Sequence, residues 1–591
     1  MLDAFWIILF LMLIVGLPYT YSRKGIKFCI GIAYIIGVVV FARLFYVFKG
    51  INSVLSSLVF SAQLFTFGIN APELIEILDE VKDSLSSPYI CCVWAAYLIC
   101  PVLTVSVLLT YIKKGLDRTT LKMKFFKEIY IFTEKNDNAL ILAEDICNNT
   151  KRSVVVFANT DGEDMGPRLL CVSYSAMQVA AFINSTNNVY ACFNDTDTGK
   201  NLDNLNEFLH RKKKKQEKIY VFLDNPVAQE VVDGMKKNVH DEIIRIVSTK
   251  AILMREILWD YPLFSNMHTP GELNVSVFGI GDFGGSFAAN TLWCSVIPDC
   301  HLKLNLVDAK TEESILTQVS ENIPKGYFDI EIYNEDINTN AFFEKIGKTR
   351  LKDSDYILVS MGNDDLNISI SRKIRLYFAR CGKNPFIMTV VKNQSKFSVM
   401  RETLKKEGIV VTGGAENIYS YKSIFKDRFF ARAFEVYKIV ENNYGNNPSE
   451  DDFFRQNQID ILSSYANAIH CKYKVFALTG TTDVSEAQIK AQLEKKHDKI
   501  VSAEHERWVV FEILKGYVGV PKENLIEFLE SNKSTRKIHK NEILKMHACI
   551  TDISGVEEAE RMIKEISGKE QKLVEIDELI AEQTAKIWFI E

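Results

Sequence analysis

Apolar and polar positions follow two different patterns along the 591-residue chain. Before residue 113, long runs carry almost no charge, and beyond residue 128, short apolar runs alternate with amphipathic segments. Three of the uncharged runs are long enough to cross a bilayer as helices, and they occupy residues 4–22, 28–48 and 89–112. The pattern therefore predicts a transmembrane domain over residues 1–113, followed by a large part outside the membrane.

A fourth uncharged run, residues 51–70, decides the topology. Basic residues gather after the first predicted span, from Arg23 to Lys27, and after the last, from Lys113 to Lys127. Placing both groups in the cytoplasm requires an even number of crossings between them. A run that enters the membrane and returns meets this condition, whereas a spanning run does not. We therefore expect a re-entrant segment in a multi-pass protein of the cell's inner (plasma) membrane, with cytoplasmic C-terminal domains.

Residues 60–72, FSAQLFTFGINAP, resemble the pore helix and filter of the potassium-channel superfamily. The resemblance implies a filter whose backbone carbonyls replace the hydration shell of a monovalent cation, formed by Thr66, Phe67, Gly68, Ile69 and Asn70. Asn70 stands where the family has its second glycine and Ile69 where it has tyrosine, which leaves potassium selectivity open. An ordinary fourth helix of a membrane anchor is the alternative for this run.

Past a basic linker, residues 114–127, strand-like apolar runs alternate with amphipathic helical segments. This is the pattern of a parallel sheet covered by helices on both faces, and it occurs twice, over residues 128–265 and 273–430. The runs fall at residues 128–132, 153–158, 189–193, 218–224 and 243–248 in the first series and at 275–279, 302–308, 329–334, 355–362, 386–391 and 408–413 in the second.

The second series opens with the signature of a nucleotide-binding turn. Gly279, Gly281 and Gly284 follow its first apolar run in G-x-G-x-x-G spacing, and Asp308 ends the next run. These glycines allow a tight turn, a close approach of the backbone to a pyrophosphate and close packing of the following helix, whose N-terminus attracts phosphate. An acid at this distance meets a ribose hydroxyl. A glycine-rich turn without a ligand is the alternative.

Residues 352–376 and 386–420 resemble the regulator-of-potassium-conductance (RCK, or TrkA-N) family, with GNDDLN at 362–367 in its strand-to-helix turn. The resemblance implies a domain that binds a nucleotide or dinucleotide (NAD-like, ATP or ADP, or a nucleotide second messenger) and changes shape without catalysing a reaction. By the same resemblance, phosphate would lie against Gly279, Gly281, Asp282, Phe283 and Gly284, ribose against Asp308, and Gly362 and Asn363 over the opposite side.

The corresponding turn of the first series, residues 133–138, contains no glycine. Without glycine the backbone approaches a pyrophosphate less closely, and Glu134 and Asp137 would repel it. We therefore expect two tandem α/β Rossmann-like units, of which the first is a degenerate copy that does not bind dinucleotide.

A polar hinge at residues 442–449 precedes a region, residues 450–591, whose periodicity is helical throughout. Within it VSAEHERWVVFEILKGYVG, residues 501–519, resembles the ryanodine-receptor-repeat (RyR) domain, so a small all-α C-terminal domain is expected. His505, Arg507 and Trp508 form a candidate second ligand site, in which the rings stack on a base and the guanidinium holds a phosphate. The alternative is that Trp508 belongs to the core and the polar residues are scaffold.

Composition narrows the function classes. A net charge of −5 gives no electrostatic reason for a nucleic-acid partner, and the 12 cysteines show no zinc spacing. No side chain stands out as placed for hydride chemistry. The leading hypothesis is a nucleotide-gated membrane effector or ion channel. By analogy with the family it would be a homotetramer, and the combination of its domains suggests bacterial antiphage signalling. A membrane-anchored nucleotide sensor without a pore is the alternative, and a membrane-tethered NAD(P)-dependent oxidoreductase is a second alternative.

Overall fold

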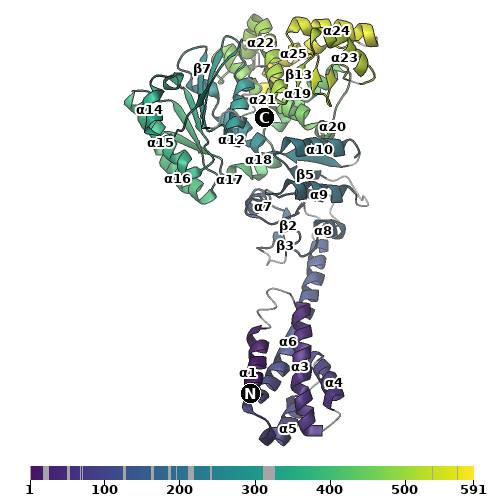
Figure 1. Ribbon diagram of the computed structural model, residues 1–591. Coiled ribbons are helices and arrows are strands. Elements are labelled where there is room, and N and C mark those ends of the chain that lie inside the picture. The colour runs from purple at the N-terminus through teal and green to yellow at the C-terminus, as the bar shows by residue number, and fades with distance from the viewer. Residues whose placement is uncertain are drawn as a thin grey trace. The chain divides into compact units, whose positions relative to one another are not determined.

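The computed structural model separates into two compact units, residues 1–125 and 126–591, which are described one by one (Figure 1). The residues described are 2–16, 26–49, 53–66, 68, 71–123, 128–160, 165–183, 188–194, 196–210, 218–239, 242–309, 326–337, 339–535, 537–568 and 570–590. Of the predicted filter, Phe67, Ile69 and Asn70 therefore lie outside the described residues.

The first unit is helical. Its elements are α1 (Leu2–Leu11), a π-helical turn (Met12–Gly16), α3 (Ile26–Lys49), α4 (Ser53–Phe65), α5 (Ala71–Val81), a 3-10 turn (Lys82–Ser84) and α6 (Ser87–Met123). Among the described residues, two stretches are long and apolar enough to cross a bilayer, Cys29–Phe48 in α3 and Ser87–Val105 in α6. They coincide with two of the three predicted spans. The first predicted span begins in α1, and its residues 17–22 are not described.

Aromatic contacts join the helices of this unit. Phe60 of α4 packs against Phe41 and Phe45 of α3, and the Tyr89 hydroxyl of α6 donates to the Val40 carbonyl of α3 at 2.6 Å. The amphipathic helix α5 buries Leu74, Leu78 and Val81. Most of the predicted basic linker, residues 114–123, continues α6 as helix.

The second unit begins with two six-stranded parallel sheets in its described residues. The first has the order β3-β2-β1-β4-β5-β6 and the second β12-β11-β10-β7-β8-β9. When the strands of each sheet are numbered in chain order, both sheets have the order 3-2-1-4-5-6, which is that of a doubly wound dinucleotide-binding fold. The second unit therefore contains two tandem Rossmann-like domains.

The strands lie where the apolar runs predict them, with one addition. The first sheet comprises β1 (Ile129–Phe132), β2 (Val154–Phe157), β3 (Leu169–Cys171), β4 (Asn188–Cys192), β5 (Lys218–Phe222) and β6 (Ile243–Val247), and the second β7 (Glu272–Phe278), β8 (His301–Asp308), β9 (Phe328–Asn334), β10 (Tyr356–Val359), β11 (Phe386–Val390) and β12 (Ile409–Thr412). Only β3 was not predicted, because three residues are too few to show a period.

Helices connect and cover the strands. They are α7 (Asp137–Asn149), α8 (Ala176–Phe182), α9 (Thr198–Leu209), α10 (Pro226–Lys236), α11 (Thr249–Asp260), a 3-10 turn (Leu263–Asn266), α12 (Asp282–Cys294), α14 (Asn340–Ile346), a 3-10 turn (Arg350–Asp353), α15 (Asp364–Arg380), α16 (Gln394–Lys406), α17 (Ala415–Ile418) and α18 (Tyr421–Ile424).

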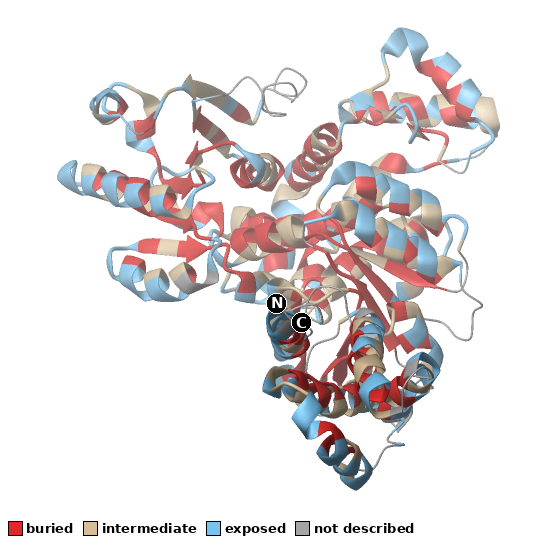
Figure 2. Ribbon diagram, turned by 60° about the horizontal axis from the view of Figure 1, so that its bottom comes forward, coloured by how far each residue is buried: buried red, intermediate tan, exposed pale blue. Residues whose placement is uncertain are grey.

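Alternate residues of one strand face the two layers of helices over the second sheet. Tyr356 and Leu358 of β10 join the core on the α12 side, while Ile357 and Val359 join the core of α14, α15 and α16. The central strands β7, β10 and β11 are buried from both faces (Figure 2), which explains their continuous apolar character, whereas the edge strand β9 is only partly buried.

The C-terminal part of the second unit packs helices around a small sheet. Its elements are α19 (Phe430–Asn443), α20 (Glu450–Arg455), α21 (Gln458–Thr479), α22 (Glu486–Leu514), a 3-10 turn (Lys522–Asn524), α23 (Leu525–Asn532), α24 (Ile553–Ser567), α25 (Leu573–Glu582), α26 (Thr584–Trp588) and strands β13 (Val518–Gly519), β14 (Lys540–Asn541) and β15 (Met546–His547). The three strands form one sheet in the order β13-β15-β14. The expectation of an all-α domain is therefore wrong, because strands of two residues carry no periodic signal.

Candidate functional site

The glycine turn after β7 has the geometry that its spacing predicts. Gly279 adopts φ +86°, and a Cβ there would lie 2.3 Å from the Ser360 carbonyl oxygen after β10. A Cβ on Gly284 would lie 1.8 Å from the Gly279 carbonyl oxygen. A Cβ on Gly281, by contrast, would meet no atom of the described residues within 4 Å. Two glycines are thus required by packing, and the third leaves the turn open to an approaching group.

Asp308, at the end of β8, contacts this turn directly. Its carboxylate accepts a hydrogen bond of 2.8 Å from the backbone N–H of Ile280. The acid expected to meet a ribose therefore also braces the turn, and the structure brings it beside the three glycines.

Helix α12 begins at Asp282 with its N-terminus at the turn. Its N-cap residue is Gly281, which has no side chain to satisfy the first N–H groups of the helix. Asp282 forms an ion pair with Lys250 of α11, and Phe283 is buried in the core on the α12 side. Asp282 and Phe283 can therefore serve a phosphate through their backbone N–H groups.

The opposite side of the crevice is formed by the turn after β10. Phe278 of β7 pairs with Val359 of β10, so both turns lie at the same edge of the sheet, where the strand order reverses. Gly362 adopts φ +78° there. The Asn363 side chain accepts from the Leu366 N–H at 3.1 Å and caps α15. Asn363 thus caps the helix, and Gly362 leaves this turn without a side chain that would fill the space above it.

Asn367 also holds this turn in place. Its side chain accepts from the Met361 N–H and donates to the Val390 carbonyl at 2.8 Å, which ties the turn to β11. The polar pattern after β10 is therefore largely structural.

The same crevice in the first sheet is bridged by side chains. Glu134 after β1 accepts a hydrogen bond from Asn194 after β4, and the Thr133 hydroxyl accepts from the Phe193 N–H at 3.0 Å. These contacts join the ends of the two strands between which a nucleotide would enter. That the first unit does not bind dinucleotide stays a prediction.

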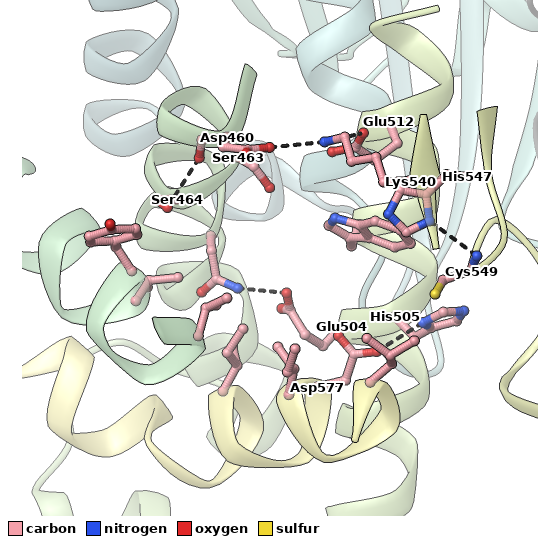
Figure 3. A pocket seen from close by; sticks show the side chains of 18 of the residues that line it. Asp460, Ser463, Ser464, Glu504, His505, Glu512, Lys540, His547, Cys549 and Asp577 are labelled. Carbon is pink, nitrogen blue, oxygen red and sulfur yellow. Dashed lines mark hydrogen bonds and ion pairs between the residues drawn. The ribbon is translucent and has the colours of Figure 1, made fainter. Parts of the chain in front are cut away.

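The C-terminal part contains a cavity of about 160 Å³ (Figure 3). His505, Arg507 and Trp508 all line it, as the candidate second site requires. Further polar side chains in its wall are Asp460, Ser463, Ser464, Asn467, Glu504, Glu512, Lys537, His539, Lys540, His547 and Asp577.

His505 is held on both ring nitrogens. Nδ1 lies 2.9 Å from the Asp577 carboxylate and Nε2 lies 2.8 Å from the Thr551 carbonyl oxygen. Both partners are acceptors, so the ring serves them best as the doubly protonated cation. Burial opposes this charge, but the hydrogen bond and charge of Asp577 outweigh it and raise the pKa of His505. His505 is therefore scaffold rather than a stacking surface.

Arg507 belongs to a buried ion network centred on Glu504. The Glu504 carboxylate accepts from Arg507 Nη2 at 2.7 Å, from Lys474 Nζ at 3.0 Å and from the Asn467 amide at 2.6 Å. Burial alone would raise the pKa of Glu504, but the charges of Arg507 and Lys474 hold it well below its ordinary value. The second guanidinium nitrogen, Nη1, has no hydrogen-bond partner among the described residues.

Trp508 is half-buried, and its ring centroid lies 4.8 Å from that of His547 in an edge-to-face contact. On the other side of the cavity Asp460 accepts from Lys537 at 2.7 Å and from Lys540 at 2.9 Å. The sequence did not reveal Asp460, Glu512 or Lys540 as site residues, since they lie on three separate elements.

Comparison with known proteins finds only weak structural similarity. No protein-family model matches the chain, and no curated protein matches it. A solved structure described as GsuK bound to ADP is similar at 14% identity and a TM-score of 0.33, covering 69% of this chain and 99% of that chain. A mutant of GsuK is similar at 13% identity and a TM-score of 0.30, with 68% and 97% covered.

The glycine geometry predicts a sharp contrast between two substitutions. Gly284→Ala forces a backbone shift and should destabilise this domain by about 3 kcal/mol, as overpacking does, whereas Gly281→Ala should change stability by less than about 0.5 kcal/mol. Hydrogen exchange of α12 in the purified full chain measures both. Equal protection of α12 in the two variants would contradict the geometry.

The His505–Asp577 pair predicts a pH dependence. A raised folded-state pKa means that its stabilisation is complete below about 6.5, the ordinary histidine value, and is lost as the pH rises through the folded pKa. Protection of α22 against hydrogen exchange, corrected for intrinsic rates, should fall as the pH rises from 6 to 9. In Asp577→Asn the decline should be much smaller, although Glu506 and Asp552 still face the ring. Parallel curves would refute the assignment.

Proposed function

We propose that this chain is a nucleotide-responsive membrane protein, with the nucleotide bound at the glycine turn after β7. The observation that carries the proposal is the open approach to Gly281, at the crevice where doubly wound sheets bind their ligands. The free N–H groups at the start of α12 suit a phosphate, and Asp308 stands at the end of the neighbouring strand. An NAD-like dinucleotide, ATP, ADP and a nucleotide second messenger each contain a phosphate for the N–H groups of α12 and a ribose for Asp308.

The ligand acts as an effector rather than as a substrate. The polar side chains at the crevice are engaged in holding the turns: Asp308 accepts from Ile280, Asn363 caps α15 and Asn367 bridges to β11. A nucleotide that prefers one arrangement of these turns shifts the population of conformations.

Nucleotide binding to the full chain in detergent tests this function. Calorimetric titration with NAD⁺, ATP and ADP should show binding of at least one of them, and Gly281→Ala should weaken it at least about tenfold, or about 1.4 kcal/mol, because the added methyl occupies the phosphate approach. Gly234→Ala in α10 is the matched control, since its Cβ also meets no atom of the described residues within 4 Å.

Two outcomes would remove the proposal. Affinity unchanged in Gly281→Ala would place the nucleotide elsewhere. Steady oxidation of NADH by the wild-type chain, lost in Gly281→Ala, would favour the membrane-tethered oxidoreductase.

A nucleotide-gated ion channel is the second candidate function, and the short helix α4 favours it over a simple anchor. Its 13 residues span about 20 Å, less than the roughly 30 Å hydrocarbon core. The chain turns directly after it, because the Gln63 carbonyl accepts from the N–H groups of Thr66 and Gly68, each at 3.0 Å. Buried Ser57 and Ser61 lie on the same helix. A helix shorter than the hydrocarbon core, with these hydrogen bonds at its C-terminus, supports the re-entrant arrangement of residues 51–70.

Cation flux into proteoliposomes distinguishes the channel from the anchor. With a nucleotide that binds the wild-type chain, we expect flux that falls at least about tenfold in Gly68→Ala, since a filter carbonyl ring tolerates little displacement, while nucleotide affinity stays the same. Gly31→Ala in α3, where a Cβ meets no atom of the described residues within 4 Å, serves as the control. Absence of flux under every nucleotide would leave the anchored sensor.

A further inference from the structure

The cavity in the C-terminal part is enclosed by helices and strands of that part and is not a gap between domains. Helices α19, α21, α22 and α25 and the loop and strands around Lys540 and His547 contribute its lining. Its volume of about 160 Å³ is well above the ~10–15 Å³ that one water needs. The space therefore suits part of a small organic molecule.

Two buried groups in its wall have unused hydrogen-bonding capacity. Arg507 and Glu512 are 2% and 1% exposed, and Arg507 Nη1 and Glu512 Oε2 have no hydrogen-bond partner among the described residues. The nearest cation to Glu512, Lys540 Nζ, is 3.8 Å from Oε2, beyond hydrogen-bond distance. Burial raises the pKa of Glu512. Leaving such groups unsatisfied is costly, which indicates that a ligand supplies an acceptor to Arg507 and a donor to Glu512.

The other charged groups around the cavity are engaged within the protein, and Glu441 accepts a hydrogen bond of 2.6 Å from the Asn446 side chain. Glu504 is paired with Arg507 and Lys474, Asp460 with Lys537 and Lys540, and Asp577 with His505. His539 and His547 are neutral, because burial lowers the pKa of His539 to about 4 and that of His547 well below its ordinary value. The lining therefore offers no surplus of positive charge for a phosphate, and the Arg507 guanidinium is already paired with Glu504.

An aromatic wall completes the site. Trp508 lies between Arg507 and Glu512 along α22 and lines the same cavity, and its contact with His547 fixes the ring. Indole rings stack on planar heterocycles, with roughly 1–3 kcal/mol per base. Arg507 and Glu512 are five residues apart, about 7.5 Å along the helix axis. Bicyclic purines carry both donors and acceptors on their edges, and they offer Trp508 a larger stacking face than single-ring pyrimidines do.

We propose that this cavity binds a purine base, stacked on Trp508, with Glu512 accepting one of its N–H groups and Arg507 Nη1 donating to a ring or carbonyl acceptor. The site lies on elements other than the glycine turn and does not depend on the proposed nucleotide site there. The ligand class is a purine nucleoside or a molecule that carries one.

Titration of the full chain in detergent with guanosine and with adenosine tests the site, with uridine as the pyrimidine comparison. At least one purine nucleoside should bind, and Glu512→Gln should weaken it at least about tenfold, because a neutral amide oxygen accepts more weakly than a carboxylate oxygen. Trp508→Leu should weaken it by a similar factor. Glu494→Gln, at an exposed position of the same helix, is the matched control and should leave the affinity unchanged.

The variants separate this site from the glycine turn. Purine binding that survives Gly281→Ala and is lost in Glu512→Gln supports the cavity. Binding lost in Gly281→Ala and unaffected by Glu512→Gln and Trp508→Leu would overturn the cavity proposal and leave the glycine site standing. No binding of either purine nucleoside by the wild-type chain, or equal binding of uridine, would overturn it as well. Circular dichroism and α22 hydrogen exchange confirm that each variant is folded.

Discussion

The buried carboxylate of Glu504 is the contact on which the C-terminal part of the molecule depends. It is fully buried, and it joins α22 to α21 through Lys474 and Asn467 while orienting Arg507 on its own helix. Removing one member of such a network leaves an uncompensated charge and typically costs about 3–5 kcal/mol. The two long helices that it holds together carry the wall of the cavity on one side and the packing surface for the second Rossmann-like domain on the other.

Helix α12 connects these two regions physically. Its N-terminus lies at the glycine turn, and near its other end Trp293 contacts Phe511 of α22 edge-to-face with centroids 6.4 Å apart. Just beyond it, the Val296 carbonyl oxygen lies 2.8 Å from the His470 ring of α21. Apolar residues from each of α12, α21 and α22 meet in one continuous core. Packed cores transmit displacement because they deform little, so α12 relates the position of the glycine turn to that of the helices around the cavity.

The two Rossmann-like domains show that one strand order supports opposite local chemistry. In the second sheet, glycines leave the turns after β7 and β10 without side chains that would fill the ligand space, and polar side chains hold these turns in place through hydrogen bonds. In the first sheet, Glu134 and Asn194 join across the equivalent edge. Fold alone therefore does not assign a ligand, and the difference lies in a few residues after the first and fourth strands of each sheet.

The sequence by itself determined the parts of this protein that depend on neighbours along the chain. Apolar runs located eleven of the twelve strands of the large sheets, and glycine spacing identified Gly279 and Gly284, because a tight turn and its helix are local structures. The tertiary structure alone decided β3, the small sheet of β13, β14 and β15, and the roles of the polar residues. His505 and Arg507 were visible in the sequence, but the contact of His505 with Asp577, the contacts of Glu504 with Lys474 and Asn467, and the unsatisfied oxygen of Glu512 were not. Hydrogen-bond partners across 30 to 72 residues of chain are set by packing, which local periodicity does not encode.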